Sequence, residues 1–141
     1  MHEQVRVHQL DQTREIIAER CPEYLESYDA VVNRTWGYMF NMMILRRDLL
    51  DAYCQWLFGI LFALRERMKD VELDAFQARF YGRVSEIIFN VWLDQQLKTG
   101  VIAPEELQEI PCIHTEPVNW AKKGTAFLKA KFMNQKYDSS F

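Results

Sequence analysis

The stretch Met39–Phe58, MFNMMILRRDLLDAYCQWLF, decides the fold because it joins two different patterns. The apolar run Trp36–Leu45 is bounded by turn-forming residues and predicts a β-strand, although it contains the polar residue Asn41. The aromatic-rich pattern that follows predicts a helix over Leu49–Met68. Asp48 lies near the expected helix start, where a carboxylate meets free backbone N–H groups and the positive end of the helix dipole.

Apolar residues recur at helical spacing through the predicted helix Leu49–Met68. The stripe consists of Leu50, Tyr53, Cys54, Leu57, Ile60, Leu61, Leu64 and Met68. Three aromatic residues, Trp56, Phe58 and Phe62, widen this apolar surface. A helix that is apolar over most of its circumference is buried on several sides, and we expect that of this one.

Three further helices are predicted from apolar residues at helical spacing, over Gln9–Arg20, Glu23–Val32 and about Asp74–Lys98. Gly100 is suited to end the last of them. Pro104 early in Ala103–Leu107 predicts a short helical turn there, and Glu109–His114 predicts a second short strand. These elements together predict an α+β fold that is mostly helical.

Size and charge restrict the class of protein. The chain has 141 residues, which suits a single domain over residues 1–141. Hydrophobic residues make up 49% of it, enough for a core. With 17 basic and 20 acidic side chains the net charge is -3, which argues against nucleic acid as a partner. The N-terminus lacks an apolar signal-peptide core, and the apolar stretch Trp56–Leu64 is too short to span a membrane.

The three cysteines are Cys21, Cys54 and Cys112, an odd number at wide spacing without a CxxC pair. Neither a zinc site nor a disulfide framework is indicated. Reduced cysteines fit a cytoplasmic protein. The nucleotide-binding and hydrolase motifs GxGxxG, P-loop, GxSxG and DxD are absent from the sequence. We therefore do not expect the chain to bind a nucleotide by itself.

The second long helix carries the best candidate constellation. Arg79, Arg83, Glu86 and Asn90 are spaced by four, three and four residues and therefore share one face. A carboxylate one turn from a guanidinium stays ionised, and such a pair could act as a general base or bind sugar hydroxyls. The alternative is a solvated helix face with a weak salt bridge.

Asn41 and the histidines allow more than one role. A buried amide needs hydrogen-bond partners, so Asn41 could bind a sugar hydroxyl or a neighbouring backbone group. His2, His8 and His114 lack metal-ligand spacing, and a surface or hydrogen-bonded structural role is expected for them.

The C-terminal segment Val118–Met133 interleaves lysines with Trp, Phe and Leu and has no acidic residue. This composition suits a surface helix that contacts anionic lipid headgroups or a phosphate-bearing ligand, with peripheral membrane contact through Trp120–Phe132. A docked C-terminal helix with solvated lysines is the alternative.

Long motifs run through nearly the whole chain: His8 with Leu10–Ile17, PEYL at Pro22–Leu25, Met39–Arg67, QARFYGRVSE at Gln77–Glu86, NVWL at Asn90–Leu93, and Ile110–Phe132. Together they resemble the family called domain of unknown function 4422, glycosyltransferase-like proteins of bacterial capsular and exopolysaccharide biosynthesis. The resemblance implies a GT-A-like nucleotide-diphosphosugar transferase fold. A segment like GL-HYRRYF in the first half of the family has no counterpart here, so the chain is expected to be the C-terminal, acceptor-side portion.

The implied reaction is transfer of a hexosyl unit from a nucleotide-diphosphate sugar to a glycan or lipid-linked acceptor. By position, Glu86 is the expected acceptor-activating base, and Arg83 is expected to orient it or contact phosphate. His8, Asn41 and Arg79 are expected to contact sugar or phosphate. No metal ligand and no cofactor are assigned in this chain.

The alternative to an enzyme is a truncated, non-catalytic interaction module. Such a module would pair with a nucleotide-binding N-terminal half, with the membrane surface or with a second copy. Either protein is expected in the cytoplasm or at the inner face of the cell membrane.

Overall fold

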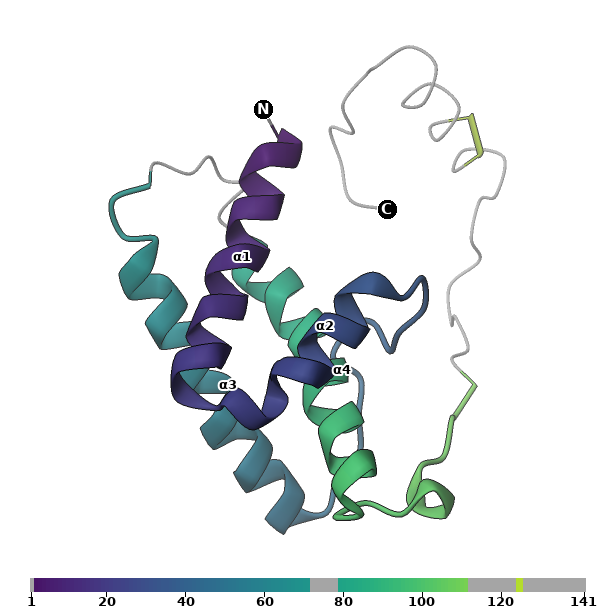
Figure 1. Ribbon diagram of the computed structural model, residues 1–141. Helices are drawn as coiled ribbons and strands as arrows, with labels where there is room; N and C mark the ends of the chain where they lie inside the picture. Colours follow the sequence, from purple (N-terminus) through teal and green to yellow (C-terminus); the bar gives the residue numbers. More distant parts are fainter. Residues whose placement is uncertain (1, 72–78, 112–123, 126–141) are drawn as a thin grey trace. The chain divides into compact units, whose positions relative to one another are not determined.

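The computed structural model describes residues 2–71, 79–111 and 124–125. Its α-helices are α1 (His2–Arg20), α2 (Leu25–Asn33), α3 (Arg47–Arg67) and α4 (Phe80–Thr99), and its short 3₁₀ turns include η1 (Pro22–Tyr24) and η3 (Pro104–Glu106) (Figure 1). Residues 1–107 and 108–141 form two compact units, and all of these elements belong to the first. The protein is therefore mostly helical in its described part. One domain over residues 1–141 stays a prediction.

The predicted helices are confirmed, with shifted ends. The first turn of the helix expected over Glu23–Val32 is the 3₁₀ turn η1, since Pro22 interrupts the α-helical hydrogen bonding. The helix α3 begins two residues before Leu49 and carries Asp48 in its first turn. At the end of α4, Gly100 adopts the left-handed conformation with φ 74°, as predicted. The expected start of α4 at Asp74 lies outside the described residues.

The predicted strand Trp36–Leu45 is wrong. This segment is an irregular loop between α2 and α3, with a turn at Phe40–Asn41. A strand needs a partner strand for its backbone groups, and the described part of the chain contains none. The α+β label therefore lacks support. In the second predicted strand, residues 109–111 are irregular and residues 112–114 lie outside the described part.

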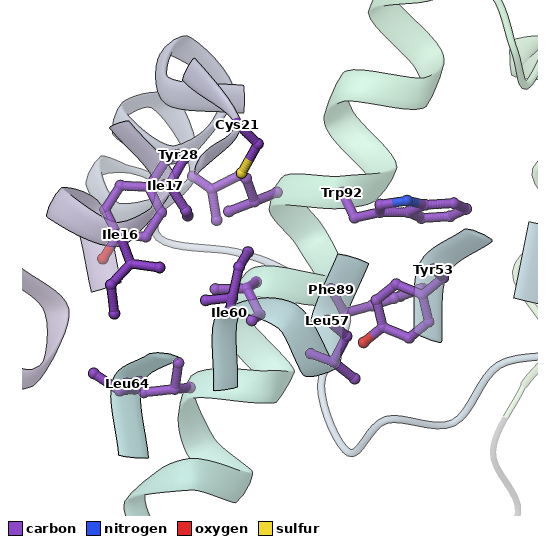
Figure 2. Close-up of a cluster of buried hydrophobic side chains, with 14 of the residues drawn as sticks. Ile16, Ile17, Cys21, Tyr28, Tyr53, Leu57, Ile60, Leu64, Phe89 and Trp92 are labelled. Atoms are coloured by element: carbon purple, nitrogen blue, oxygen red, sulfur yellow. The ribbon is translucent and has the colours of Figure 1, made fainter. Parts of the chain in front are cut away.

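The core of the first unit lies between the four α-helices. Figure 1 shows α1 beside α3 and α2 beside α4, and α3 also packs on α4. Every one of these helices contributes buried apolar side chains to the cluster in Figure 2. Tyr53 of α3 makes ring contacts with Phe89 and Trp92 of α4, with centroids 5.5 and 5.2 Å apart. Aromatic contacts of this kind add to the burial that holds α3 and α4 together.

One flank of α3 departs from the prediction that this helix is buried on several sides. Most of the predicted stripe is buried or half-buried, but Leu50, Phe58 and Phe62 are exposed. The rings of Phe58 and Phe62 stack on each other with centroids 5.8 Å apart. In the described residues α3 packs on α1 and α4, which leaves this flank open.

Two tyrosines in the core differ in how their hydroxyl groups are satisfied. Tyr28 donates a hydrogen bond to the backbone carbonyl of Leu10 at 2.7 Å. The buried hydroxyl of Tyr53 has no partner among the described residues. Burial also raises the pKa of Tyr53 to about 12.

A bidentate ion pair joins α1 and α2 at the surface. Arg14 donates to both carboxylate oxygens of Asp29, each at 2.7 Å. These hydrogen bonds from Arg14, followed by its charge, lower the pKa of Asp29.

Candidate functional site

The candidate site is formed where the Trp36–Leu45 loop lies against α4. Asn90, on the buried side of α4, holds the loop through one residue. The backbone N–H of Tyr38 donates to Asn90 Oδ1 at 2.7 Å, and Asn90 Nδ2 donates to the Tyr38 carbonyl at 2.8 Å. Asn90 Nδ2 also donates to the Glu86 carbonyl at 2.8 Å. A single amide thus gives Tyr38 the two hydrogen bonds that a partner strand would give, and we call this contact the Asn90 clamp.

Close approach at the clamp explains the glycine next to Tyr38. A Cβ atom on Gly37 would lie 3.0 Å from Asn90 Oδ1 and 3.3 Å from Asn90 Cγ. Such a contact is tighter than ordinary van der Waals packing, so a side chain at this position requires the loop or Asn90 to shift by a few tenths of an ångström.

After the clamp the loop turns sharply. Phe40 and Asn41 both have positive φ, at 72° and 49°. Asparagine tolerates this region, whereas a bulky residue such as Phe adopts it at an energetic cost. Asn41 Nδ2 donates to Ser85 Oγ at 3.1 Å, and Ser85 Oγ donates to the Gly82 carbonyl at 2.7 Å. The turn is therefore fixed to α4 by a second polar contact.

The second contact gives Asn41 a partner that the sequence did not predict. Its amide nitrogen donates to a side chain of α4, and within the described part of the chain no backbone group accepts from it. Asn41 is exposed as a whole, and no described residue donates to its Oδ1. As far as the described residues go, that oxygen can accept a hydrogen bond from a ligand hydroxyl.

Of the predicted site residues, Arg83 and Glu86 share one face of α4, and Asn41 reaches the same turn of this helix through Ser85. Asn41 contacts Ser85, the neighbour of Glu86 in sequence, and Arg83 lies one turn before Glu86 on α4. Arg83 and Glu86 are half-buried. Arg79 is the exposed residue at the start of α4, one turn before Arg83. Arginine and carboxylate side chains at helical spacing suit the binding of a polyhydroxylated, phosphate-bearing ligand.

His8 is not brought to this place. It is exposed on α1, and no described hydrogen bond or ion pair joins it to α4 or to the Trp36–Leu45 loop. The remaining C-terminal prediction, contact through Trp120–Phe132, lies almost entirely outside the described residues.

Sequence reasoning did not assign Gly37, Tyr38 or Ser85 to the site and gave Asn90 no separate role. The glycine in an otherwise large-residue run was the available signal for close backbone contact. The position of Asn90 on the same helix face as Arg83 and Glu86 also indicated that it belongs to the site. Which backbone group it meets depends on tertiary structure.

The described residues offer no metal centre, since no group of three or more His, Cys, Asp or Glu side chains among them could hold a metal ion. Within the same residues, the longest apolar helical segments fall short of what crossing a bilayer requires. The candidate site consists of the carboxylate of Glu86, the guanidinium groups of Arg79 and Arg83, and the amide of Asn41.

The chain belongs to the family described as domain of unknown function 4422, whose family model matches residues 1–97. The matched region contains α1 to α3, the Trp36–Leu45 loop and most of α4, and so includes the whole candidate site. Comparisons with curated proteins and with solved structures gave no match.

Proposed function

We infer that this chain is the acceptor-side portion of a glycosyltransferase that acts in bacterial surface polysaccharide synthesis. Its donor would be a nucleotide-diphosphate sugar, bound by a GT-A-like half that this sequence lacks the motifs to supply. The observation that carries the proposal is the docking of the Trp36–Leu45 loop on α4, which sets the amide of Asn41 beside the Arg83–Glu86 turn. The resemblance of its motifs to those of glycosyltransferase-like proteins supports it as well.

The chemistry follows from the groups at the site. An acceptor hydroxyl attacks the anomeric carbon of the donor sugar, and Glu86 takes the hydroxyl proton as the new C–O bond forms. The bond from the anomeric carbon to the diphosphate oxygen breaks, and the leaving diphosphate keeps the electron pair. Arg83 and Arg79 would neutralise its charge, and Asn41 Oδ1 would orient a sugar hydroxyl.

The proposal is tested by combining the chain with a polypeptide that carries the nucleotide-binding half. Release of nucleoside diphosphate is then measured over a panel of nucleotide sugars and acceptors. Because a general base contributes about a hundredfold or more, Glu86→Gln is expected to lower the rate by at least that factor. The matched control is Glu105→Gln, the same change at an exposed carboxylate in η3.

Two results would count against the proposal. Wild-type rates in Glu86→Gln would refute the assignment of the base. An absence of acceptor-dependent diphosphate release for every donor would refute the transferase itself.

A non-catalytic interaction module is the second candidate, favoured by the open flank of α3. Phe58 and Phe62 form an exposed stacked pair there, an apolar surface that pairing with a nucleotide-binding half would cover. Phe58→Ser with Phe62→Ser is then expected to weaken that complex in sedimentation experiments. An unchanged complex would remove the reason for this candidate.

A further inference from the structure

The open flank of α3 exposes two aromatic side chains at its middle. Within the described residues α1 and α4 pack on other sides of α3, and Figure 1 shows α3 along the left edge of the four helices. Phe58 is 47% exposed and Phe62 is 61% exposed, although their rings stack on each other. Each ring leaves apolar area in water, and removing that area from water is favourable. A pair of this kind on an otherwise open helix face indicates an interaction surface.

An open hollow lies beside the aromatic pair, where α1 meets α3. It has a volume of about 290 Å³ and is lined by Glu19, Arg20, Phe62, Ala63, Glu66 and Arg67. Pockets for small ligands usually hold about 300–1,000 Å³, so a hollow of this size suits one large side chain of a partner. Anchoring of an aromatic side chain in such a hollow, with charged residues around it, is typical of interfaces between polypeptides.

One acidic and one basic residue extend the aromatic pair into a line along α3. Asp51, Phe58, Phe62 and Lys69 are spaced by seven, four and seven residues. With 3.6 residues per turn, these spacings place all four on the same side of the helix. Lys69 lies in the turn that directly follows α3, and both charged residues are exposed. The line therefore has an acid at one end, a base at the other, and its midpoint at Ile60.

Both charges are accessible to a partner. Asp51 contacts Arg47 at 3.6 Å, but the two side chains are 69% and 92% exposed, so this weak ion pair leaves the carboxylate open to a second partner. Lys69 forms no ion pair with another described residue. Arg65 and Glu66, one turn before Lys69, carry opposite charges that largely cancel at a distance. The base at this end of the line is therefore left without compensation in the described part of the chain.

We propose that this flank of α3 pairs with the same flank of a second copy of the chain. The two α3 helices run antiparallel about a twofold axis near Ile60. In this arrangement Phe58 of one copy meets Phe62 of the other, beside the hollow, and Asp51 of one copy meets Lys69 of the other. The twofold symmetry makes each of these contacts twice.

The order of the charges favours an antiparallel second copy over other partners. A parallel pair would bring Asp51 against Asp51 and Lys69 against Lys69, and like charges at an interface are repulsive. Antiparallel helices also bring opposite ends of their dipoles together. A nucleotide-binding half could cover the same flank, as in the second candidate function. The second copy is the partner whose complementary surface this chain itself contains.

The contact is expected to be weak and concentration-dependent. The 21 residues of α3 extend over about 30 Å, and one face of a single helix gives an interface at the small end of the range for specific complexes. Self-association requires no catalysis, so the proposal does not rest on the proposed function. Glu86→Gln is accordingly expected to associate like the wild type.

The experiment is sedimentation velocity of the full chain from about 1 μM to about 1 mM. We expect a monomer–dimer equilibrium that shifts to dimer as concentration rises. Phe58→Ser with Phe62→Ser is expected to weaken the dimer about a hundredfold or more, because four aromatic rings no longer leave water. Both positions are exposed, so the variant should keep the wild-type circular dichroism spectrum. Phe40→Ser is the matched control, since it removes an exposed ring from the Trp36–Leu45 loop and should leave the dimer unchanged.

A charge swap tests the antiparallel register. Lys69→Asp alone, or Asp51→Lys alone, replaces two attractive contacts by two repulsive ones and is expected to weaken the dimer about tenfold. The double variant Asp51→Lys with Lys69→Asp restores opposite charges only where the two positions face each other across the twofold axis. It is therefore expected to recover most of the wild-type association.

Several outcomes would overturn the proposal. A wild type that stays monomeric over the whole concentration range would do so, as would a dimer that the double Phe variant leaves intact or that Phe40→Ser abolishes. A double charge variant that dimerises no better than the single ones would refute the antiparallel register. If the chain does not self-associate but the double Phe variant weakens its complex with a nucleotide-binding half, the flank belongs to that partner instead.

Discussion

Replacing Asn90 by alanine tests the contact on which the candidate site depends. Asn90 is 2% exposed and makes three hydrogen bonds, the two of the clamp to Tyr38 and a third to the Glu86 carbonyl. A neutral hydrogen bond contributes about 1 kcal/mol net, so three lost bonds predict a decrease in the free energy of unfolding of about 3 kcal/mol. That is a large fraction of the stability of an ordinary domain.

The assay is urea unfolding of the full chain, followed by circular dichroism. The midpoint should decrease while the slope with urea stays the same, because the surface exposed on unfolding hardly changes. Asn33→Ala is the matched control, since Asn33 makes a single hydrogen bond to the Asp29 carbonyl at the exposed end of α2. Its effect is expected within about 0.5 kcal/mol. A difference of less than about 1 kcal/mol between the two variants would refute the reasoning.

A second variant separates hydrogen bonding from shape. Asn90→Asp keeps the size of the side chain but removes the donor to the carbonyls of Tyr38 and Glu86. A buried carboxylate facing two carbonyl oxygens has a raised pKa. The variant is therefore least destabilised below the unfolded aspartate pKa of about 4, and loses further stability as pH rises through the folded-state pKa. Wild-type stability at every pH would mean that the shape of the side chain alone matters, and a loss that does not change with pH would contradict a raised folded-state pKa.

Three further predictions use the same unfolding assay. Gly37→Ala places a methyl group against Asn90 and should destabilise the protein by about 1–3 kcal/mol. Gly59→Ala lies in the middle of α3 where a Cβ meets no neighbour, and should stabilise by about 0.5–1 kcal/mol. Equal effects of the two variants would contradict the close contact at Gly37. Tyr53→Phe removes an unpartnered buried hydroxyl and should be neutral or stabilising by up to about 1 kcal/mol at neutral pH. The wild type is expected to lose stability between pH 10 and about 12, because the Tyr53 hydroxyl loses its proton more easily in the unfolded state than in the folded state. Tyr53→Phe should remove this loss. Asp29→Asn should destabilise slightly at neutral pH. Because Arg14 lowers the folded-state pKa of Asp29, the difference from wild type should begin to shrink at the ordinary aspartate pKa and vanish as pH falls through the folded-state pKa. A difference in stability that persists in stronger acid would contradict this.

The local parts of the fold were predictable from sequence because their causes are local. Helical spacing of apolar residues located α1 to α4, and Gly100 marked the end of α4 because a left-handed residue is needed there. The Arg83–Glu86 face followed from helical geometry alone. The long motifs of the chain also indicated its family, which the match over residues 1–97 confirms.

Only the tertiary structure decided the conformation of the Trp36–Leu45 loop and the exposure of one flank of α3. The sequence pattern of the loop predicts a strand. Its backbone partner is instead the side chain of Asn90, 52 residues away from Tyr38. A local sequence pattern cannot predict a contact at that separation. The positive φ of Asn41 likewise depends on Ser85 of α4. Phe58 and Phe62 read as core residues, but burial needs a neighbouring element, and the described helices leave that flank open. Local sequence therefore determines which segments are helical. Packing between distant segments determines which polar groups find hydrogen-bond partners and which apolar surfaces stay exposed.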